Sequence, residues 1–195
     1  MDLKLLAWGL RGKPGPLPRL WLFTDQHRLA DPRPSVAALP RGRAGVVLRH
    51  DGDPCRATLG RDLARICRQR NLTLVVAGDA RLAASLKAGL HLRGGFRPSV
   101  LRPPGIITSS AHSVRDLTRA HRTGAALVFL SPAFPTESHR GAPGLGPLRW
   151  AALARQAACR PRIGALGGVD GQTIARLPLG LCQAVGAIGA LSAGS

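Results

Sequence analysis

Short apolar runs alternate with helix-like segments along most of the chain. Most of the runs lack the in-and-out alternation of a half-exposed strand, which is typical of parallel strands covered on both faces. Eight runs are predicted to be strands: Leu20–Thr24, Ala44–Arg49, Thr73–Ala77, Gly89–Leu92, Gly105–Ser109, Ala126–Ser131, Arg162–Leu166 and Ala184–Ile188. Five intervening segments are predicted to be helices: Pro54–Arg70, Asp79–Ala88, Ser113–Arg122, Leu148–Ala158 and Gly171–Leu177.

This repeating order of strands and helices predicts a single, compact (β/α)8 barrel of the α/β class. In such a barrel the functional residues lie at the carboxyl ends of the strands. A chain of 195 residues is short for this fold, which typically takes about 250. The alternative is a doubly wound open sheet, which calls for a glycine-rich loop after the first strand. Thr24-Asp25-Gln26-His27 stands there instead, so the barrel is favoured.

Proline and glycine interrupt three parts of the pattern. Arg93–Pro104 holds two glycines and three prolines, so the fourth helix is predicted to be short or missing. Asp31–Arg41 holds three prolines, with the same expectation. Residues 1–19 are also rich in glycine and proline and are predicted to be a flexible leader before a barrel domain at residues 20–195.

The amino-acid composition limits the kinds of partner that are expected. The net charge is +18 and comes almost wholly from arginine, because lysine occurs only at Lys4, Lys13 and Lys87. The arginines are spread singly and aromatic residues make up only 4%, so a nucleic-acid partner is not expected. No run is long enough for a membrane span, and no membrane partner is expected. The oligomeric state stays open, a homo-oligomer included.

The cysteines indicate the compartment. The chain has four, and none has a neighbour at CxxC spacing. They are therefore interpreted as reduced thiols rather than a disulfide framework or a zinc site, which favours a cytoplasmic location. They are Cys55, Cys67, Cys159 and Cys182.

Two loops at strand ends carry the candidate chemistry. Ser131-Pro132-Ala133-Phe134-Pro135-Thr136 follows the sixth run, and its small hydroxyls suit an anion such as a phosphate. Gly167, Gly168 and Gly189 lie at the ends of the seventh and eighth runs, where barrels often bind phosphate through backbone N–H groups. They are predicted to bind phosphate, although a glycine pair is also typical of a tight turn.

The order and spacing of seven motifs resemble the thiamine phosphate synthase family and its sister branch, the TenI-like thiazole tautomerases. The motif "G-P-V-F-P-T", matched by Ser131–Thr136, is the most specific. The others are "L-I-T-D", "Q-L-R", "H-L-G", "S-x-H-S", "A-I-G-G-I" and "V-A-V-I-S-A-L", matched by Leu22–Asp25, Val47–Arg49, His91–Leu92, Ser110–Ser113, Ala165–Val169 and Val185–Leu191.

The resemblance implies a synthase that joins hydroxymethylpyrimidine diphosphate to a thiazole phosphate with the help of Mg²⁺. The diphosphate and metal motifs, however, are degenerate. "R-E-K" becomes Arg49-His50-Asp51, "N-D" aligns with Ala77-Gly78, and Arg93–Arg115 contains no acid. "T-x-T-K" becomes Thr136-Glu137-Ser138-His139. No metal site and no cofactor are therefore expected, and Mg²⁺ enters only if Asp51 and Asp79 rebuild a site in a true synthase.

His112 is the candidate for acid–base catalysis that the tautomerase branch supplies, because imidazole both takes and returns protons near neutral pH. The alternative is that Ser110–Ser113 is only a helix entry. His91 is expected to pack at a strand end. Solvent-facing positions are expected for His27, His50 and His121. Residues predicted to contact substrate are Arg49, Ser110, Thr136, Ser138 and His139.

Three functions follow from the resemblance. The leading interpretation is a small-molecule pocket for a thiazole phosphate or a similar heteroaromatic phosphate, with TenI-like tautomerase activity. The alternatives are a functional synthase and a non-catalytic regulator, so whether the protein is an enzyme stays open. Replacing Gly168 by Asp is expected to abolish phosphate binding while the fold stays largely intact, with Gly141→Asp as the milder control.

Overall fold

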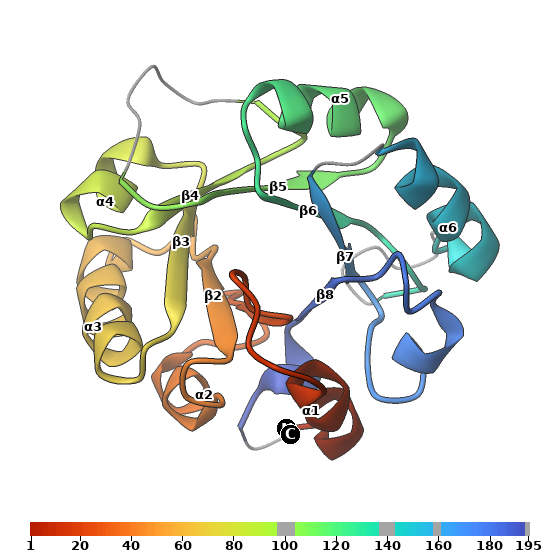
Figure 1. The fold of residues 1–195 in the computed structure, drawn as a ribbon. Coiled ribbons are helices and arrows are strands. Elements are labelled where there is room, and N and C mark those ends of the chain that lie inside the picture. Colours follow the sequence, from red (N-terminus) through yellow and green to blue (C-terminus); the bar gives the residue numbers. More distant parts are fainter. Residues whose placement is uncertain (97–103, 137–142, 158–160, 194–195) are drawn as a thin grey trace.

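Eight parallel strands close into a barrel in the computed structural model, which describes residues 1–96, 104–136, 143–157 and 161–193 (Figure 1). Each strand pairs with the next in the sequence, and β8 pairs with β1. The strands are β1 (Leu20–Phe23), β2 (Ala44–Leu48), β3 (Thr73–Ala77), β4 (Gly89–Leu92), β5 (Ile107–Ala111), β6 (Leu127–Leu130), β7 (Arg162–Leu166) and β8 (Ala184–Ala187). The predicted barrel is confirmed, and the open sheet is excluded.

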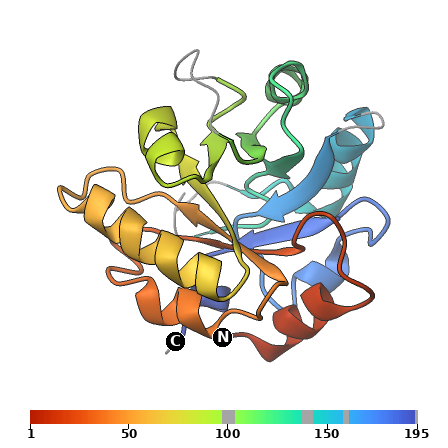
Figure 2. The same cartoon turned by 60° about the vertical axis from the view of Figure 1, so that its left-hand side comes forward.

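Helices form the outer layer around the strands, as the two cartoon views show (Figures 1 and 2). The α-helices are α1 (Leu3–Leu10), α2 (Arg33–Ala38), α3 (Arg56–Gln69), α4 (Ala80–Ser85), α5 (Val114–Arg122) and α6 (Gly146–Gln156). Two 3₁₀ turns, η2 (Ile174–Arg176) and η3 (Gly189–Leu191), follow β7 and β8. The helix predicted at Gly171–Leu177 is thus reduced to a single 3₁₀ turn.

Aromatic rings fill the interior of the barrel. Trp21 and Phe23 of β1 both meet the ring of Phe129 edge-on, with centroids 5.8 and 4.9 Å apart. Each ring lies against a glycine on a neighbouring strand, and a Cβ on that glycine would overlap the ring. The pairs are Gly45 with Trp21, Gly186 with Phe23 and Gly164 with Phe129. Three aromatic residues and three glycines on neighbouring strands therefore fill the barrel interior together.

The expectation of a flexible leader is wrong for residues 3–10. Asp2 caps α1 by accepting hydrogen bonds from Lys4 N and Leu5 N, and the helix buries Leu5 and Trp8 one turn apart. The helix packs beside β1, because Gly9 lies so close to Leu20 that a side chain there would overlap it. The glycines and prolines that suggested disorder belong to the segment after the helix.

The first residues also reach the carboxyl ends of β7 and β8. Asp2 N donates to Ala190 O at 2.7 Å, and an Asp2 carboxylate oxygen accepts from Gly171 N at 2.7 Å. Gly171 follows the Gly167-Gly168 loop, and Ala190 belongs to η3. The helix α1 therefore lies in the outer layer between η2 and α2, and its capping residue ties together the loops after β7 and β8 (Figure 1).

The connection between β4 and β5 is the one predicted to lack a full helix. Of its described residues, 93–96 form a tight turn closed by a β-bridge between Arg93 and Phe96, and 104–105 form a bend, while residues 97–103 lie outside the described part. The strand β5 begins at Ile107 rather than Gly105, and Gly105 packs directly against the backbone of Gly89. The second predicted exception, Asp31–Arg41, contains the short helix α2, as expected.

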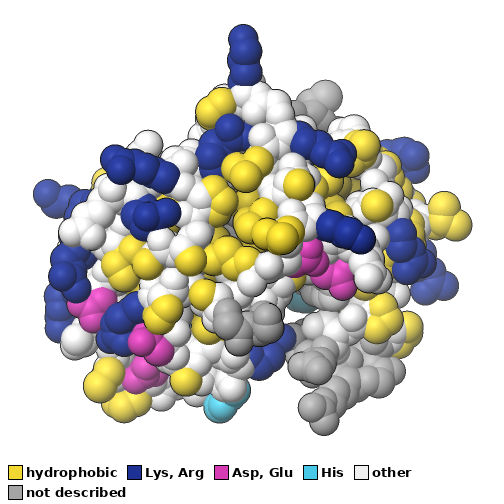
Figure 3. Space-filling view, turned by 90° about the horizontal axis from the view of Figure 1, so that it is seen from below, with side chains coloured by type: hydrophobic (Ala, Val, Ile, Leu, Met, Phe, Trp, Pro, Cys, Tyr) yellow, Lys and Arg dark blue, Asp and Glu magenta, His cyan; other side chains and the backbone are white. Residues whose placement is uncertain are grey.

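Charge is widely distributed over the surface. On the face in Figure 3, Lys and Arg side chains lie scattered around an apolar area and are accompanied by a few acidic residues. Among the described residues, no helix combines the length and the apolar character needed to cross a membrane. Cys67 and Cys182 are buried, and burial raises the pKa of each thiol to about 12.

The packing of α1 can be tested by Trp8→Ala. Trp8 is buried and stacks under the Arg19 guanidinium, 4.1 Å from the ring centroid. We expect a loss of about 3–5 kcal/mol in the free energy of unfolding, measured by urea denaturation, because a large cavity forms. Leu3→Ala is the matched control, since Leu3 is 79% exposed on the same helix and should change stability by less than about 0.5 kcal/mol. Equal effects would contradict this role of α1.

Candidate functional site

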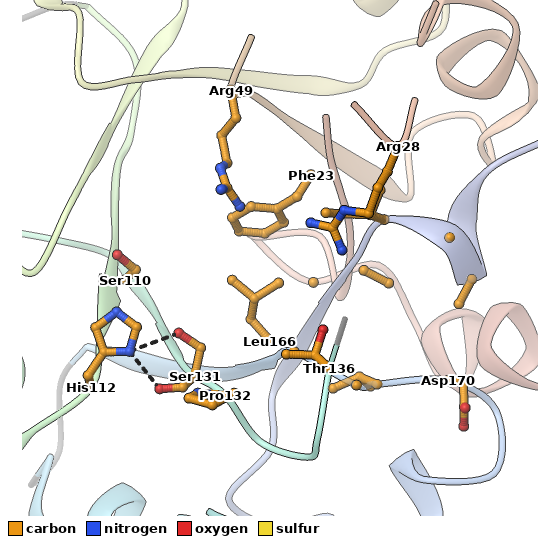
Figure 4. A pocket seen from close by; sticks show the side chains of 18 of the residues that line it. Phe23, Arg28, Arg49, Ser110, His112, Ser131, Pro132, Thr136, Leu166 and Asp170 are labelled. Atoms are coloured by element: carbon orange, nitrogen blue, oxygen red, sulfur yellow. Dashed lines mark hydrogen bonds between the residues drawn. The ribbon is translucent and has the colours of Figure 1, made fainter. Parts of the chain in front are cut away.

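A pocket of about 740 Å³ opens at the carboxyl ends of the strands. Phe23 and Leu166 lie at its centre, with arginines on one side and the loop after β6 on the other (Figure 4). This is the position at which barrel enzymes place their active sites. A cavity of this size, with an apolar floor and a few polar groups at its rim, is typical of a small-molecule site.

Three arginines line the pocket. The Arg49 guanidinium is partly buried and makes no hydrogen bond or ion pair to any described residue. Burial lowers the pKa of this group, which nevertheless stays charged at neutral pH. Arg28 is held by Asp25, whose carboxylate pairs with the guanidinium at 3.2 Å and also accepts from Arg28 N. Arg93 pairs with Asp51. The arginines make this side of the pocket suited to an anion.

The glycine loop after β7 lines the opposite part of the pocket. Gly167 and Gly168 have φ values of +89° and +62°, which glycine adopts without strain. Among the described residues, the N–H groups of Gly168 and Val169 have no hydrogen-bond partner. The nearby Asp170 carboxylate accepts from Gln172 N and Thr173 N, and it points away from the cavity (Figure 4). The loop therefore offers donors to a ligand.

The same geometry corrects the expectation that Gly168→Asp leaves the fold intact. A Cβ at Gly168 would overlap the carbonyl of Pro135 and come within 2.8 Å of Phe134 Cβ, in a backbone conformation that disfavours side chains. At Gly189, by contrast, a Cβ would meet no heavy atom within 4 Å, so this position tolerates a side chain. The control for Gly168, Gly141, lies outside the described residues.

His112 stands at the rim of the pocket with a fixed orientation. Its Nδ1 donates to the carbonyl oxygen of Ser131 at 2.8 Å, so Nε2 carries the lone pair, and Nε2 points toward Ser110, another residue of the pocket wall (Figure 4). A reciprocal cap holds the backbone here, because His112 N donates to an Asp116 carboxylate oxygen and Asp116 N donates to Ser113 Oγ. The hydrogen bonds that begin α5 therefore also fix the backbone of His112, the candidate base.

His91 forms part of the pocket floor, as expected for a strand end. It is 3% exposed, its Nδ1 lies 2.9 Å from Thr108 Oγ1, and its ring meets Phe23 edge-on. Burial, with a smaller contribution from the charges of Arg49 and Arg93, lowers the pKa of this imidazole to about 3. His91 is neutral at physiological pH and adds no charge to the site.

Most of the predicted site residues come together in this pocket. Its lining includes His112, Gly167, Gly168, Gly189, Arg49, Ser110 and Thr136. The other two, Ser138 and His139, lie outside the described residues. Sequence reasoning missed Arg28 and Arg93, which follow the ends of β1 and β4 and could have been found as cations just beyond predicted strands. His27 and His121 are exposed, as expected.

The expectation that His50 faces solvent is wrong. This residue is 1% exposed, and its Nδ1 lies 2.9 Å from Thr24 Oγ1. The same hydroxyl accepts from Arg49 N at 2.9 Å. The Thr24 hydroxyl therefore links the ends of β1 and β2 one residue beyond the strands and holds the His50 imidazole inside the protein. This contact depends on how the two strands are aligned, which the local sequence pattern does not reveal.

Comparison with known proteins agrees with this geometry. A model described as thiamine monophosphate synthase matches residues 21–191. The chain belongs to this family. It is 35% identical over 128 residues to the thiamine biosynthesis bifunctional protein ThiED of Geobacter sulfurreducens, covering 61% of this chain and 26% of that protein. It is 30% identical over 165 residues to the thiamine-phosphate synthase of Synechococcus sp., covering 80% of this chain and 46% of that protein.

The chain thus spans less than half the length of these two relatives. A thiamine phosphate pyrophosphorylase from Pyrococcus furiosus has a similar structure, with a TM-score of 0.75 and 22% identity. The similarity covers 90% of this chain and 88% of that one. It shows that the fold is shared.

The buried, neutral state of His91 leads to a prediction about how the free energy of unfolding depends on pH. Between pH 6.5 and 3 the unfolded chain binds a proton at this histidine and the folded chain does not, so the free energy of unfolding falls as the pH falls. This contribution is up to about 1.4 kcal/mol per pH unit. His91→Asn, which keeps a polar atom near Thr108, should flatten the pH dependence measured by urea denaturation at pH 4–6. A slope as steep as that of the unchanged protein would contradict the buried, neutral state.

Proposed function

We propose that the pocket binds a small heteroaromatic phosphate of the thiazole phosphate type, and that His112 moves a proton on the bound ring as in TenI-like tautomerases. The observation that carries this proposal is the placement of His112, which lines the pocket with Nδ1 anchored on Ser131 O and with Nε2 on the side of Ser110 in the pocket wall. A base must reach its proton within hydrogen-bond distance, and a ligand in this pocket is within that reach.

The chemistry is an isomerisation that needs no oxidant. Nε2 takes a proton from one ring atom as the double bond shifts, and the same nitrogen returns a proton to another atom. The Nδ1–H stays on the Ser131 carbonyl, which stabilises the imidazolium formed in between. Arg49 and Arg28 extend toward the cavity from the opposite side, where their charges stabilise the negative charge that develops on the ring (Figure 4).

The phosphate is assigned to the loops after β7 and β8. Gly168 and Val169 supply N–H groups that have no described partner, and Gly189 lies beside them in the pocket wall. A phosphate bound there leaves the ring over Phe23 and Leu166, between the arginines and His112. The size of the pocket suits one such ligand.

A functional synthase is the second candidate, favoured by the family membership and by the three arginines, which would hold a diphosphate. The two reactions differ in what they release. A synthase yields diphosphate from hydroxymethylpyrimidine diphosphate and a thiazole phosphate, whereas a tautomerase needs the thiazole ligand alone. Diphosphate release that depends on Mg²⁺ would establish the synthase. If the protein binds the thiazole phosphate but catalyses neither reaction, the non-catalytic regulator is the remaining interpretation.

The phosphate assignment can be tested at Gly189. We expect Gly189→Asp to weaken binding of a thiazole phosphate at least about tenfold in calorimetry, because the new carboxylate repels the phosphate at close range. Gly189→Asn has nearly the same size without the charge and should lose much less. Equal losses for both variants, or none for either, would place the phosphate elsewhere.

The role of His112 can be tested with His112→Asn. Asparagine can still donate to Ser131 O but has no atom in the place of Nε2. We expect ligand binding to change by less than about twofold, while isomerisation, followed by NMR of the thiazole ring protons, falls by about 10²–10⁴. Isomerisation at the original rate would show that another group carries the proton.

A further inference from the structure

Arg56, the first residue of α3, reaches into a ring of oxygen atoms at the carboxyl ends of β2 and β3. Its Nη2 donates to Ala77 O at 2.6 Å and pairs with Asp51 Oδ1 at 3.1 Å. Its Nη1 lies 3.9 Å from Asp79 Oδ2. The side chain is only 16% exposed, so these contacts are largely shielded from water. One guanidinium thus holds both of the acids that are candidate metal ligands.

The three oxygens around Arg56 are the kind of donor set that a divalent cation takes. Two carboxylates and a backbone carbonyl are hard ligands, and Mg²⁺ in phosphate-handling sites commonly uses one or two carboxylates. The family resemblance implies Mg²⁺ for a synthase. The residues present do not fit that metal, because the position between the carboxylates is filled by a cation that belongs to the chain. Among the described residues, no group of three or more His, Cys, Asp or Glu side chains could hold a metal ion.

We propose that Arg56 is the resident cation of this site and that the pocket takes its anionic ligand without a divalent metal. The charges support this directly. Asp51 pairs with Arg56 and also with Arg93, and Asp79 pairs with Arg56, so two carboxylates face two guanidiniums. The cluster has no net negative charge with which to attract Mg²⁺.

The cluster also sets the charge that a ligand meets. Arg93 lines the pocket, while Arg56 stands behind it and does not. By engaging one side of the Asp51 carboxylate, Arg56 limits how strongly that acid neutralises Arg93. Together with Arg49, which makes no ion pair to any described residue, Arg93 presents positive charge to a ligand in the pocket. Arg56 is therefore a positioning residue, acting on the ligand through Asp51 and Arg93.

The inference can be tested by metal titration without any phosphate ligand, so its outcome is separate from that of the proposed function. Mn²⁺, whose binding is read by electron paramagnetic resonance, is added to the unchanged protein and to Arg56→Ala. We expect no specific binding to the former. The variant exposes Asp51, Asp79 and Ala77 O, and it should bind one Mn²⁺ at least about tenfold more tightly.

Two variants control for charge and for location. Arg61→Ala removes the same charge from the same helix and should not gain a Mn²⁺ site, because Arg61 is exposed and donates to Thr58 Oγ1 rather than to an acid. Arg56→Ala combined with Asp51→Asn should lose the gained site. A folded Arg56→Ala protein, as judged by circular dichroism, that gains no Mn²⁺ would overturn the proposal, as would tight Mn²⁺ binding by the unchanged protein.

A second measurement covers the case in which Arg56→Ala does not fold. Binding of inorganic phosphate to the unchanged protein is followed by ³¹P NMR in EDTA and in excess Mg²⁺. We expect affinities that agree within about twofold, because the arginines replace the metal. An affinity about tenfold higher with Mg²⁺ would show that the metal displaces Arg56, and the proposal would fail even if phosphate binds where we assign it.

Discussion

The packing of three aromatic rings against three strand glycines determines where this barrel can hold a ligand. Trp21, Phe23 and Phe129 occupy the interior because the glycines opposite them have no Cβ, and the interior is therefore solid below the level of Phe23. Phe23 and the neutral His91 then form the floor of the pocket. The pocket therefore opens at the carboxyl ends of the strands, where the loops supply the polar groups.

Those polar groups are held by the loops' own hydrogen bonds. Asp25 holds Arg28 through both its backbone and its guanidinium, and Asp116 holds the backbone of His112. Asp170 closes its own turn through Thr173. Asp25, Asp116 and Asp170 thus orient the cations and donors around the pocket through local hydrogen bonds and ion pairs.

The fold could be predicted from the sequence because the strands are buried on both faces and give continuous apolar runs. Three strands, Thr73–Ala77, Gly89–Leu92 and Arg162–Leu166, have the predicted bounds. The helix α1 was missed because the glycines and prolines after it dominated the composition of residues 1–19. The glycines of the site were found because they follow strands directly. The ion pairs of Arg56 with Asp51 and Asp79 were not predicted, because they join loops that follow different strands and leave no periodic signal in the sequence.

The bond between Asp2 and Gly171 has a consequence for the order of folding. It joins residues 169 positions apart, and Asp2 N also depends on η3 after the last strand. Contacts of such long sequence separation form late, because the loop they close must first be ordered. The early strands can pair while the chain is still being synthesised. The loops after β7 and β8, which carry the glycine donors, can be joined by Asp2 only once nearly the whole barrel has been made. Partly synthesised chains therefore lack a finished binding site, and ligand cannot stabilise them before closure.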